Sequence, residues 1–259
     1  TERGSRLRQK LVFLDIEWAN APEEAAARLM ADPRLARWRH WLVTTRRTRP
    51  HLLSEPEEKI LSEKAVTGAA AWARFFDEVH GANRYAWEGA QVPEQVVLAK
   101  LYEADRAVRK AAAASVTNGL HAVERTTTYI ANTLLADKAS DDGLRKYRGW
   151  ISSRNMDNQV DDDTVEALIR AVTGRYDIVA RYYRLKRRLL GLDELFDYDR
   201  YAPLPAAERR YSWDEARTIV LDAYRRFHPR LAEIAARFFS ERWIDADVHP
   251  GKRGGAFCD

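Results

Sequence analysis

Apolar side chains recur at helical spacing along most of the 259 residues, and helix-capping residues precede several of these stretches. One stretch begins at Ser54, where Ser-Glu-Pro-Glu-Glu combines a cap, a first-turn proline and acids that favour the positive end of a helix dipole. The stripe that follows comprises Ile60, Leu61, Ala65, Ala69, Trp72, Phe75, Phe76 and Val79. This spacing predicts one amphipathic helix that ends at Gly81. A chain built from such segments is expected to be mainly α, with stacked antiparallel helices.

Two further helix starts carry polar caps. Asn20 precedes Pro22 and two glutamates, which predicts a helix over the residues that follow. Asp161 opens a run of three acids before residues 165–175. Three adjacent acids can bind a divalent metal, but acids at a helix N-terminus need no ion to explain them, and we favour that interpretation.

Long helical patterns also cover residues 94–135, 175–190 and 213–243. Asn118-Gly119 is the expected interruption of the first pattern, and Pro229 is expected to kink the last. Between the helices, RYAWEGAQV at residues 84–92 alternates around a glycine and predicts a short hairpin or extended connection.

The composition fits a globular protein without a strong electrostatic field. Apolar residues make up 46% of the chain and charged residues 32%, and eight Trp argue against disorder. The formal net charge is only +4, because 43 basic residues face 39 acidic ones. The basic stretch that contains Arg46-Arg47 therefore favours a helix end and a solvated turn. Runs such as Arg46-Arg47 and Lys186-Arg187-Arg188 leave nucleic-acid binding only as a weaker alternative.

The cysteine content and hydropathy bear on location. A single cysteine, Cys258, excludes an internal disulfide framework and fits a reducing compartment. No apolar run approaches the roughly 18 to 20 residues that span a bilayer. We therefore predict a cytoplasmic protein that does not bind membranes. The chain begins without Met, so its first residue need not be the first of its gene.

Familiar catalytic motifs are absent from the sequence. None of the six histidines begins an HExxH motif, and no nucleophile elbow, Walker loop or dinucleotide fingerprint occurs. His121 and Glu124 lie one helical turn apart and are either half of a metal site or an exposed helix pair, which we favour. The remaining potential ligands match no metal spacing and favour a surface loop: Asp245, Asp247, His249, Cys258 and Asp259.

Several strings resemble one family in order and spacing. They are EEKILSEKAVTGAAAWARFFDEV, SRNMDNQVDDDTVEALIRAV, YYRLKRRLLGLDELFDYDRYAPL and GKRGGAFC, which together cover roughly residues 50 to 258. They are similar to the amino-terminal portion of the oligoendopeptidase F family, a branch of the zinc oligopeptidases related to thimet oligopeptidase. The resemblance implies a helical amino-terminal domain over residues 1–162 and the start of a peptidase catalytic domain over 163–259.

The resemblance also implies an activity. Family members enclose a deep channel and cut short peptides with a zinc held by an HExxH helix and a later glutamate. This sequence ends before that motif, so no catalytic or metal-binding residue is carried over to it. We expect zinc in the full-length parent, none in this chain, and no activity from the chain alone.

The end of the chain resembles the entrance strand of the catalytic sheet. The segment Gly254–Cys258 would be the first strand of a truncated sheet, and its exposed edge could pair with a peptide or with a second copy of the chain. Its small residues permit close approach, which makes Gly254, Gly255, Ala256 and Phe257 the candidate substrate-binding residues. The alternative is that Gly254-Gly255 forms only a turn.

A second functional class stays open. A non-catalytic helical scaffold or peptide-binding protein would show the same helix pattern, and the missing HExxH motif favours it if residue 259 is the natural end.

Overall fold

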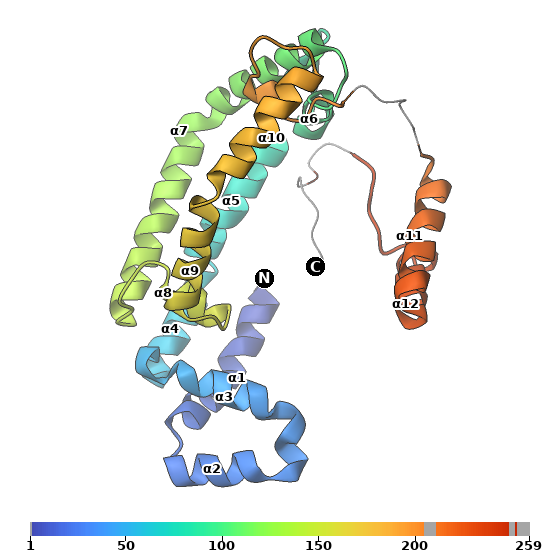
Figure 1. Ribbon diagram of the computed structural model, residues 1–259. Helices are drawn as coiled ribbons and strands as arrows, with labels where there is room; N and C mark the ends of the chain where they lie inside the picture. The colour runs from blue at the N-terminus through green and yellow to red at the C-terminus, as the bar shows by residue number, and fades with distance from the viewer. Residues whose placement is uncertain (1, 205–210, 249–251, 253–259) are drawn as a thin grey trace. The chain divides into compact units, whose positions relative to one another are not determined.

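The computed structural model describes residues 2–204, 211–248 and 252 (Figure 1). The predicted mainly α class is confirmed, with one small sheet in the described part of the chain. The α-helices are α1 (Glu2–Asn20), α2 (Glu23–Ala31), α3 (Arg39–Arg47), α4 (Glu55–Ala65), α5 (Ala69–Ala82), α6 (Glu94–Lys100), α7 (Arg106–Leu144), α8 (Ser152–Asp157), α9 (Asp162–Thr173), α10 (Tyr176–Leu189), α11 (Trp213–Phe227) and α12 (Pro229–Ser240). The strands are β1 (Tyr85–Trp87) and β2 (Ala90–Val92), and 3-10 helices span Pro33–Trp38, Arg49–His51 and Asp197–Asp199.

The backbone divides into two compact units. The first comprises residues 1–83 and 120–181, and the second comprises 84–119 and 182–259. The division therefore falls within α7 and α10. The boundary after residue 162 that the family resemblance implies concerns the domains of a peptidase and stays a prediction.

The first unit has a small core beneath α1. This helix packs against α3 and α4, and Trp18, Ala26 and Leu42 form a buried cluster. The indole Nε1 of Trp18 donates a 2.8 Å hydrogen bond to the carbonyl oxygen of Leu42, so the large aromatic ring is buried with its polar atom satisfied.

Arg46 shows what the basic stretch on α3 does. Its Nη1 donates 3.0 Å hydrogen bonds to the carbonyl oxygens of Trp18 and Ala21, at the end of α1 and just beyond it. Its Nη2 lies 2.7 Å from the carboxylate of Glu23. This guanidinium therefore joins three segments of the first unit.

Two of the three predicted helix caps are confirmed. The Glu57 carboxylate accepts hydrogen bonds from the backbone N and Oγ of Ser54 at 2.8 and 2.6 Å, and Asp161 accepts a 2.7 Å bond from Thr164 N. The prediction for Asn20 is wrong, because α1 runs through Asn20 and Pro22 is the residue that precedes α2.

The single helix predicted over the stripe from Ile60 to Val79 is also wrong. The chain breaks between α4 and α5, where the backbone N of Thr67 and of Gly68 both donate to the carbonyl oxygen of Lys64. The carbonyl oxygen of Gly68 then accepts the first hydrogen bonds of α5. A Cβ on Gly68 would lie 3.0 Å from the Lys64 oxygen, so glycine suits this tight turn. The later end is also shifted, since α5 continues past Gly81 to Ala82.

The second unit contains the predicted hairpin. Strands β1 and β2 pair antiparallel with Tyr85 opposite Val92, and Glu88 and Gly89 form the two-residue turn. Both turn residues have positive φ, 48° and 81°, as a hairpin of this length requires. Tyr85, Val97 and Ala112 form the buried cluster under the hairpin.

Helix α7 runs without a break through Asn118-Gly119, so the predicted interruption there is wrong. The break lies earlier, over residues 101–105, where Asp105 Oδ1 accepts a 2.8 Å bond from Ala107 N at the start of α7. Gly119 has a packing role instead. Its missing side chain leaves room for the ring of Tyr85, since a Cβ there would lie 2.3 Å from Tyr85 Cδ1.

Residues 213–243 form a hairpin of two helices and not one kinked helix. His228 is extended, with φ −160° and ψ 124°, and separates α11 from α12. The ring of Trp213 at the start of α11 lies 5.8 Å from that of Phe239 near the end of α12, so the two helices run antiparallel. Pro229 occupies the first position of α12, where its missing N–H costs nothing.

The predicted strand at Gly254–Cys258 lies outside the described residues. No helix in the described ranges is long and apolar enough to cross a bilayer.

Candidate binding pocket

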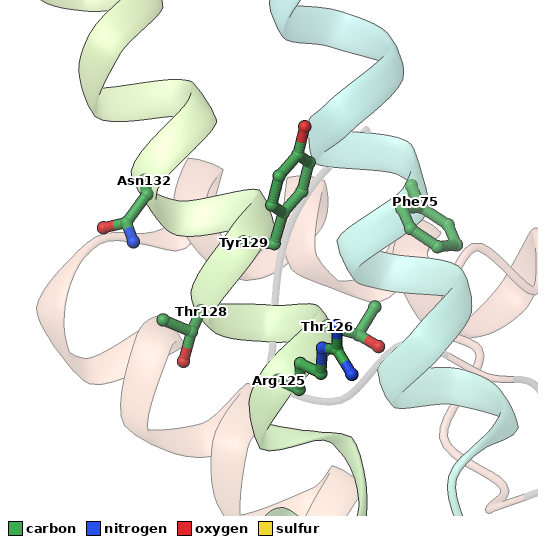
Figure 2. Close-up of a pocket in the computed structure, with 6 residues that line it drawn as sticks. All are labelled: Phe75, Arg125, Thr126, Thr128, Tyr129 and Asn132. Atoms are coloured by element: carbon green, nitrogen blue, oxygen red, sulfur yellow. The ribbon is translucent and has the colours of Figure 1, made fainter.

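A pocket of about 400 Å³ lies in the first unit, between α5 and α7 (Figure 2). Its volume falls within the roughly 300–1,000 Å³ range of small-ligand sites. The lining residues are Phe75 from α5 and Arg125, Thr126, Thr128, Tyr129 and Asn132 from α7. Figure 2 shows Tyr129 and Arg125 extending from α7 on the side of α5, with Thr128 and Asn132 on the same helix but farther from α5.

Helical spacing brings the α7 residues together. Arg125, Tyr129 and Asn132 are separated by four and three positions and so follow one side of the helix. On α5, the ring of Trp72 lies near both lining aromatic rings, with ring centroids 6.4 Å from Phe75 and 5.6 Å from Tyr129. Both of these rings stay partly open to solvent, since Phe75 is 42% and Tyr129 63% exposed.

Arg125 is the charged group of the pocket. Its side chain is exposed, and no ion pair joins it to another residue of the described part of the chain. The neighbouring acid, Glu124, lies 2.9 Å from Nδ1 of His121. An arginine guanidinium presents donors that match a carboxylate or phosphate, so the pocket can bind an anion next to an apolar group.

The pocket is suited to binding and not to bond cleavage. Its six lining residues include no carboxylate, imidazole or thiol. It therefore lacks a general base and the ligand types that hold zinc.

Asp199 anchors a buried ion-pair cluster in the second unit. Its carboxylate is fully buried and accepts 2.9 and 2.8 Å bonds from Nη2 of Arg106 and Nη2 of Arg109. Burial acts to raise the pKa of Asp199, but hydrogen bonds from the two arginines and the Phe196 amide outweigh it, and the pKa falls below its ordinary range. The cluster fixes the segment around Asp199 to the start of α7.

Lys186 completes this cluster. It is buried and donates a 2.7 Å bond to the carbonyl oxygen of Arg200. Burial, with a smaller contribution from Arg109, lowers its pKa, while Asp199 opposes the change. Because its ammonium group is held by a backbone carbonyl, we assign Lys186 a structural role.

A second ion-pair cluster joins α4 to the end of α7 in the first unit. Arg145 donates to both carboxylate oxygens of Glu58, at 2.6 and 3.0 Å, and to Asp141 at 3.0 Å. Burial acts to raise the pKa of Glu58, but the hydrogen bonds from Arg145 and the backbone N–H of Leu53, together with the charge of Arg145, outweigh it and the pKa is lowered. The carboxylate is thus held ionised against its guanidinium partner.

The structure tests only some of the candidate residues from the sequence. Gly254, Gly255, Ala256 and Phe257 lie outside the described residues, so their substrate-binding role stays a prediction. His121 and Glu124 form the exposed helix pair that was favoured. Within the described ranges, no three His, Cys, Asp or Glu residues gather to hold a metal.

Asp245 and Asp247 lie in the described part of the loop that follows α12. Nζ of Lys252 donates to their carbonyl oxygens at 2.8 and 2.7 Å and lies 3.0 Å from the Asp245 carboxylate. This arrangement fits the surface-loop interpretation for these two residues.

Sequence reasoning missed the pocket. The signal available was an arginine followed by a tyrosine and an asparagine on one side of a helix, in ERTTTYIAN. That pattern is common on solvated helices. It indicates a pocket only once the structure shows that Phe75 and Trp72 of α5 lie beside it.

The fold is that of the oligoendopeptidase F proteins. Residues 17–84 match the family model described as Oligopeptidase F. The crystal structure of oligoendopeptidase-F from Enterococcus faecium superposes with a TM-score of 0.71, over 95% of this chain and 54% of that one, at 20% sequence identity.

The curated relatives of this chain are also oligopeptidases. The chain is 27% identical over 238 residues to Group B oligopeptidase PepB of Streptococcus agalactiae, which covers 88% of this chain and 39% of PepB. It is 25% identical over 234 residues to Oligopeptidase PepF of Bacillus subtilis, covering 84% of this chain and 34% of PepF. The predicted resemblance to the oligoendopeptidase F family is therefore confirmed, and the chain spans well under half the length of these relatives.

Proposed function

We propose that these residues form the amino-terminal part of a longer zinc-dependent oligoendopeptidase that hydrolyses short peptides in an enclosed channel. The match to oligopeptidase PepB along 88% of the chain is the observation that carries this proposal. The Oligopeptidase F match at residues 17–84 and the shared fold support it independently. A reducing, cytoplasmic location, suggested by the single Cys258, is part of the same proposal.

The exposed apolar face of α9 favours a longer protein. Leu168, Ile169 and Val172 are 63%, 55% and 51% exposed, although they are spaced as one helical stripe. Water-exposed stripes of this kind mark surfaces that pack against other polypeptide. In the proposed enzyme, additional residues of the same protein cover this face.

The described residues of this chain offer no matching ligand set for the zinc of that enzyme. The sequence has no HExxH motif, and the described residues hold no group of three potential ligands. We therefore assign the metal, the catalytic glutamate and bond cleavage to polypeptide outside these 259 residues. Residues of the α5–α7 pocket would bind part of the peptide, and Gly254–Phe257 would pair with its backbone.

Metal analysis combined with a peptidase assay tests this assignment. The isolated chain, dialysed and mixed with a quenched fluorescent peptide, is expected to retain no stoichiometric zinc and to cleave nothing. One tightly held zinc per chain together with cleavage would show that the active site is built from these residues after all.

A non-catalytic helical scaffold or peptide-binding protein is the second candidate. The observation that favours it is a pocket with binding groups but no catalytic group. The two candidates differ in the gene, since a peptidase requires an HExxH motif after residue 259 in the same reading frame. Sequencing the source gene beyond that codon decides between them.

A further inference from the structure

We propose that the α5–α7 pocket binds the carboxyl-terminal end of a short peptide, with Arg125 on the free carboxylate and the terminal apolar side chain against Phe75 and Tyr129. This inference deepens the proposed function, on which it rests, by assigning substrate recognition to a particular site. It requires no catalysis by this chain.

The charge of the pocket points to an anion. Arg125 lines it without an ion-pair partner in the described ranges, although the sequence places Glu124 beside it. That carboxylate is held by His121 at 2.9 Å, on the preceding turn of α7. On α5, Arg74 is also occupied, since its Nη2 donates a 2.9 Å bond to the carbonyl oxygen of Val66. Arg125 is therefore left to bind an incoming acceptor.

The remaining lining points to an apolar group next to that anion. Phe75 and Tyr129 leave 42% and 63% of their surfaces exposed beside Trp72, so an aliphatic or aromatic side chain that covers them removes apolar area from water. The hydroxyl of Thr126 lies on the α5 side of α7. It can form a hydrogen bond with a peptide group between the bound carboxylate and the bound apolar side chain.

A peptide terminus fits this pocket better than a phosphate compound. Tightly bound phosphates are usually held by several cations or by a helix N-terminus, whereas this lining offers one guanidinium in the middle of α7. One guanidinium matches one carboxylate in charge and in geometry. The volume of about 400 Å³ accommodates one or two residues and not a long chain.

Paired peptides test the carboxylate contact. N-acetyl-Gly-Phe and its carboxamide differ only in the terminal charge, and each is titrated into the 259-residue chain by calorimetry at low salt. We expect the acid to bind about tenfold more tightly than the amide, because only the acid forms an ion pair with Arg125. Equal affinities, or no binding of either peptide at millimolar concentration, would overturn the proposal.

Substitutions test whether Arg125 causes the preference for the acid. Arg125→Gln should abolish the preference for the acid because it removes the cation, and Arg125→Lys should keep part of the preference because it keeps the charge. Arg28→Gln, at an exposed arginine on α2, is the matched control and should change nothing. A preference that survives in Arg125→Gln, or falls equally in Arg28→Gln, would contradict the assignment.

The contact between the peptide's apolar side chain and the pocket is tested separately. Tyr129→Ala should weaken the acid and the amide by the same factor, because the ring contacts the side chain that both peptides share. Circular dichroism of each variant establishes that the helices are intact. None of these titrations depends on hydrolysis, so failure of the pocket proposal leaves the peptidase proposal standing. Failure of the peptidase proposal would appear in the zinc and cleavage measurements and not in these titrations.

Discussion

Gly119 and Tyr85 are packed so closely that a Cβ on the glycine would lie 2.3 Å from Cδ1 of the ring. The tyrosine is completely buried, and its hydroxyl donates a 3.1 Å bond to the Glu94 carboxylate. A glycine in the middle of a helix weakens that helix, and in this protein the weakening is offset by a close contact between α7 and the hairpin.

Gly119→Ala should therefore destabilise the protein, although alanine is the better helix former. We expect a loss of about 1–3 kcal/mol in the free energy of unfolding, because the methyl group displaces the Tyr85 ring. Gly143→Ala is the matched control in the same helix, since a Cβ there meets nothing within 4 Å. Because Gly143 lies one residue before the end of α7, this substitution should stabilise by less than the roughly 0.5–1 kcal/mol of a mid-helix site. Urea unfolding measures both, and equal effects of the two substitutions would contradict the packing role.

Asp199→Asn should destabilise strongly, because it leaves the buried guanidinium of Arg109 without its anionic partner. Breaking one side of a buried ion pair costs about 3–5 kcal/mol. Asp193→Asn, at an exposed acid on the preceding turn, should have little effect. Thermal unfolding at neutral pH compares the two.

The cost of Asp199→Asn should also depend on pH. Folding lowers the pKa of Asp199 below its ordinary value of 3.8, so this carboxylate stabilises the fold above that pH and the contribution is lost as pH falls through the lowered pKa. The stability difference between wild type and variant should thus be constant near neutral pH and shrink in acid. A difference that stays constant down to about pH 2 would show that Asp199 is not held as an anion.

Asp161→Ala should cost about 0.5–2 kcal/mol, because it removes the acceptor for the backbone N–H of Thr164 at the start of α9. Asp163→Asn keeps that cap and removes only one charge from the first turn, so it should cost about 0.3–1 kcal/mol. Amide hydrogen exchange in the first turn of α9 should rise in the first variant and stay low in the second.

The sequence allowed correct predictions where the cause was local. The turn at Glu88-Gly89 and the caps at Ser54 and Asp161 involve residues within a few positions of one another, so residue type and spacing were enough. The same holds for most helices, because their apolar stripes can be recognised in the sequence without knowing which elements pack against them.

Predictions failed where distant residues decided the outcome. Asn118-Gly119 is typical of a helix break, but the glycine is kept inside α7 by the ring of Tyr85, 34 positions earlier. Pro229 indicates a kink, whereas the pairing of α11 with α12 makes it the start of a second helix.

The candidate pocket could not be predicted for the same reason. Arg125 and Tyr129 lie 50 or more positions from Phe75, and nothing in their own segment indicates that α5 lies beside them. The family resemblance supplied the fold but no residue of this site.

The complete gene product that contains these 259 residues provides the most direct test of the central claim. Its hydrolysis of a short quenched peptide should be measured before and after a zinc chelator, and again after zinc is restored. Our account predicts internal cleavage that the chelator abolishes and zinc recovers. A product that cleaves no peptide, or one whose cleavage is unaffected by the chelator, would contradict it.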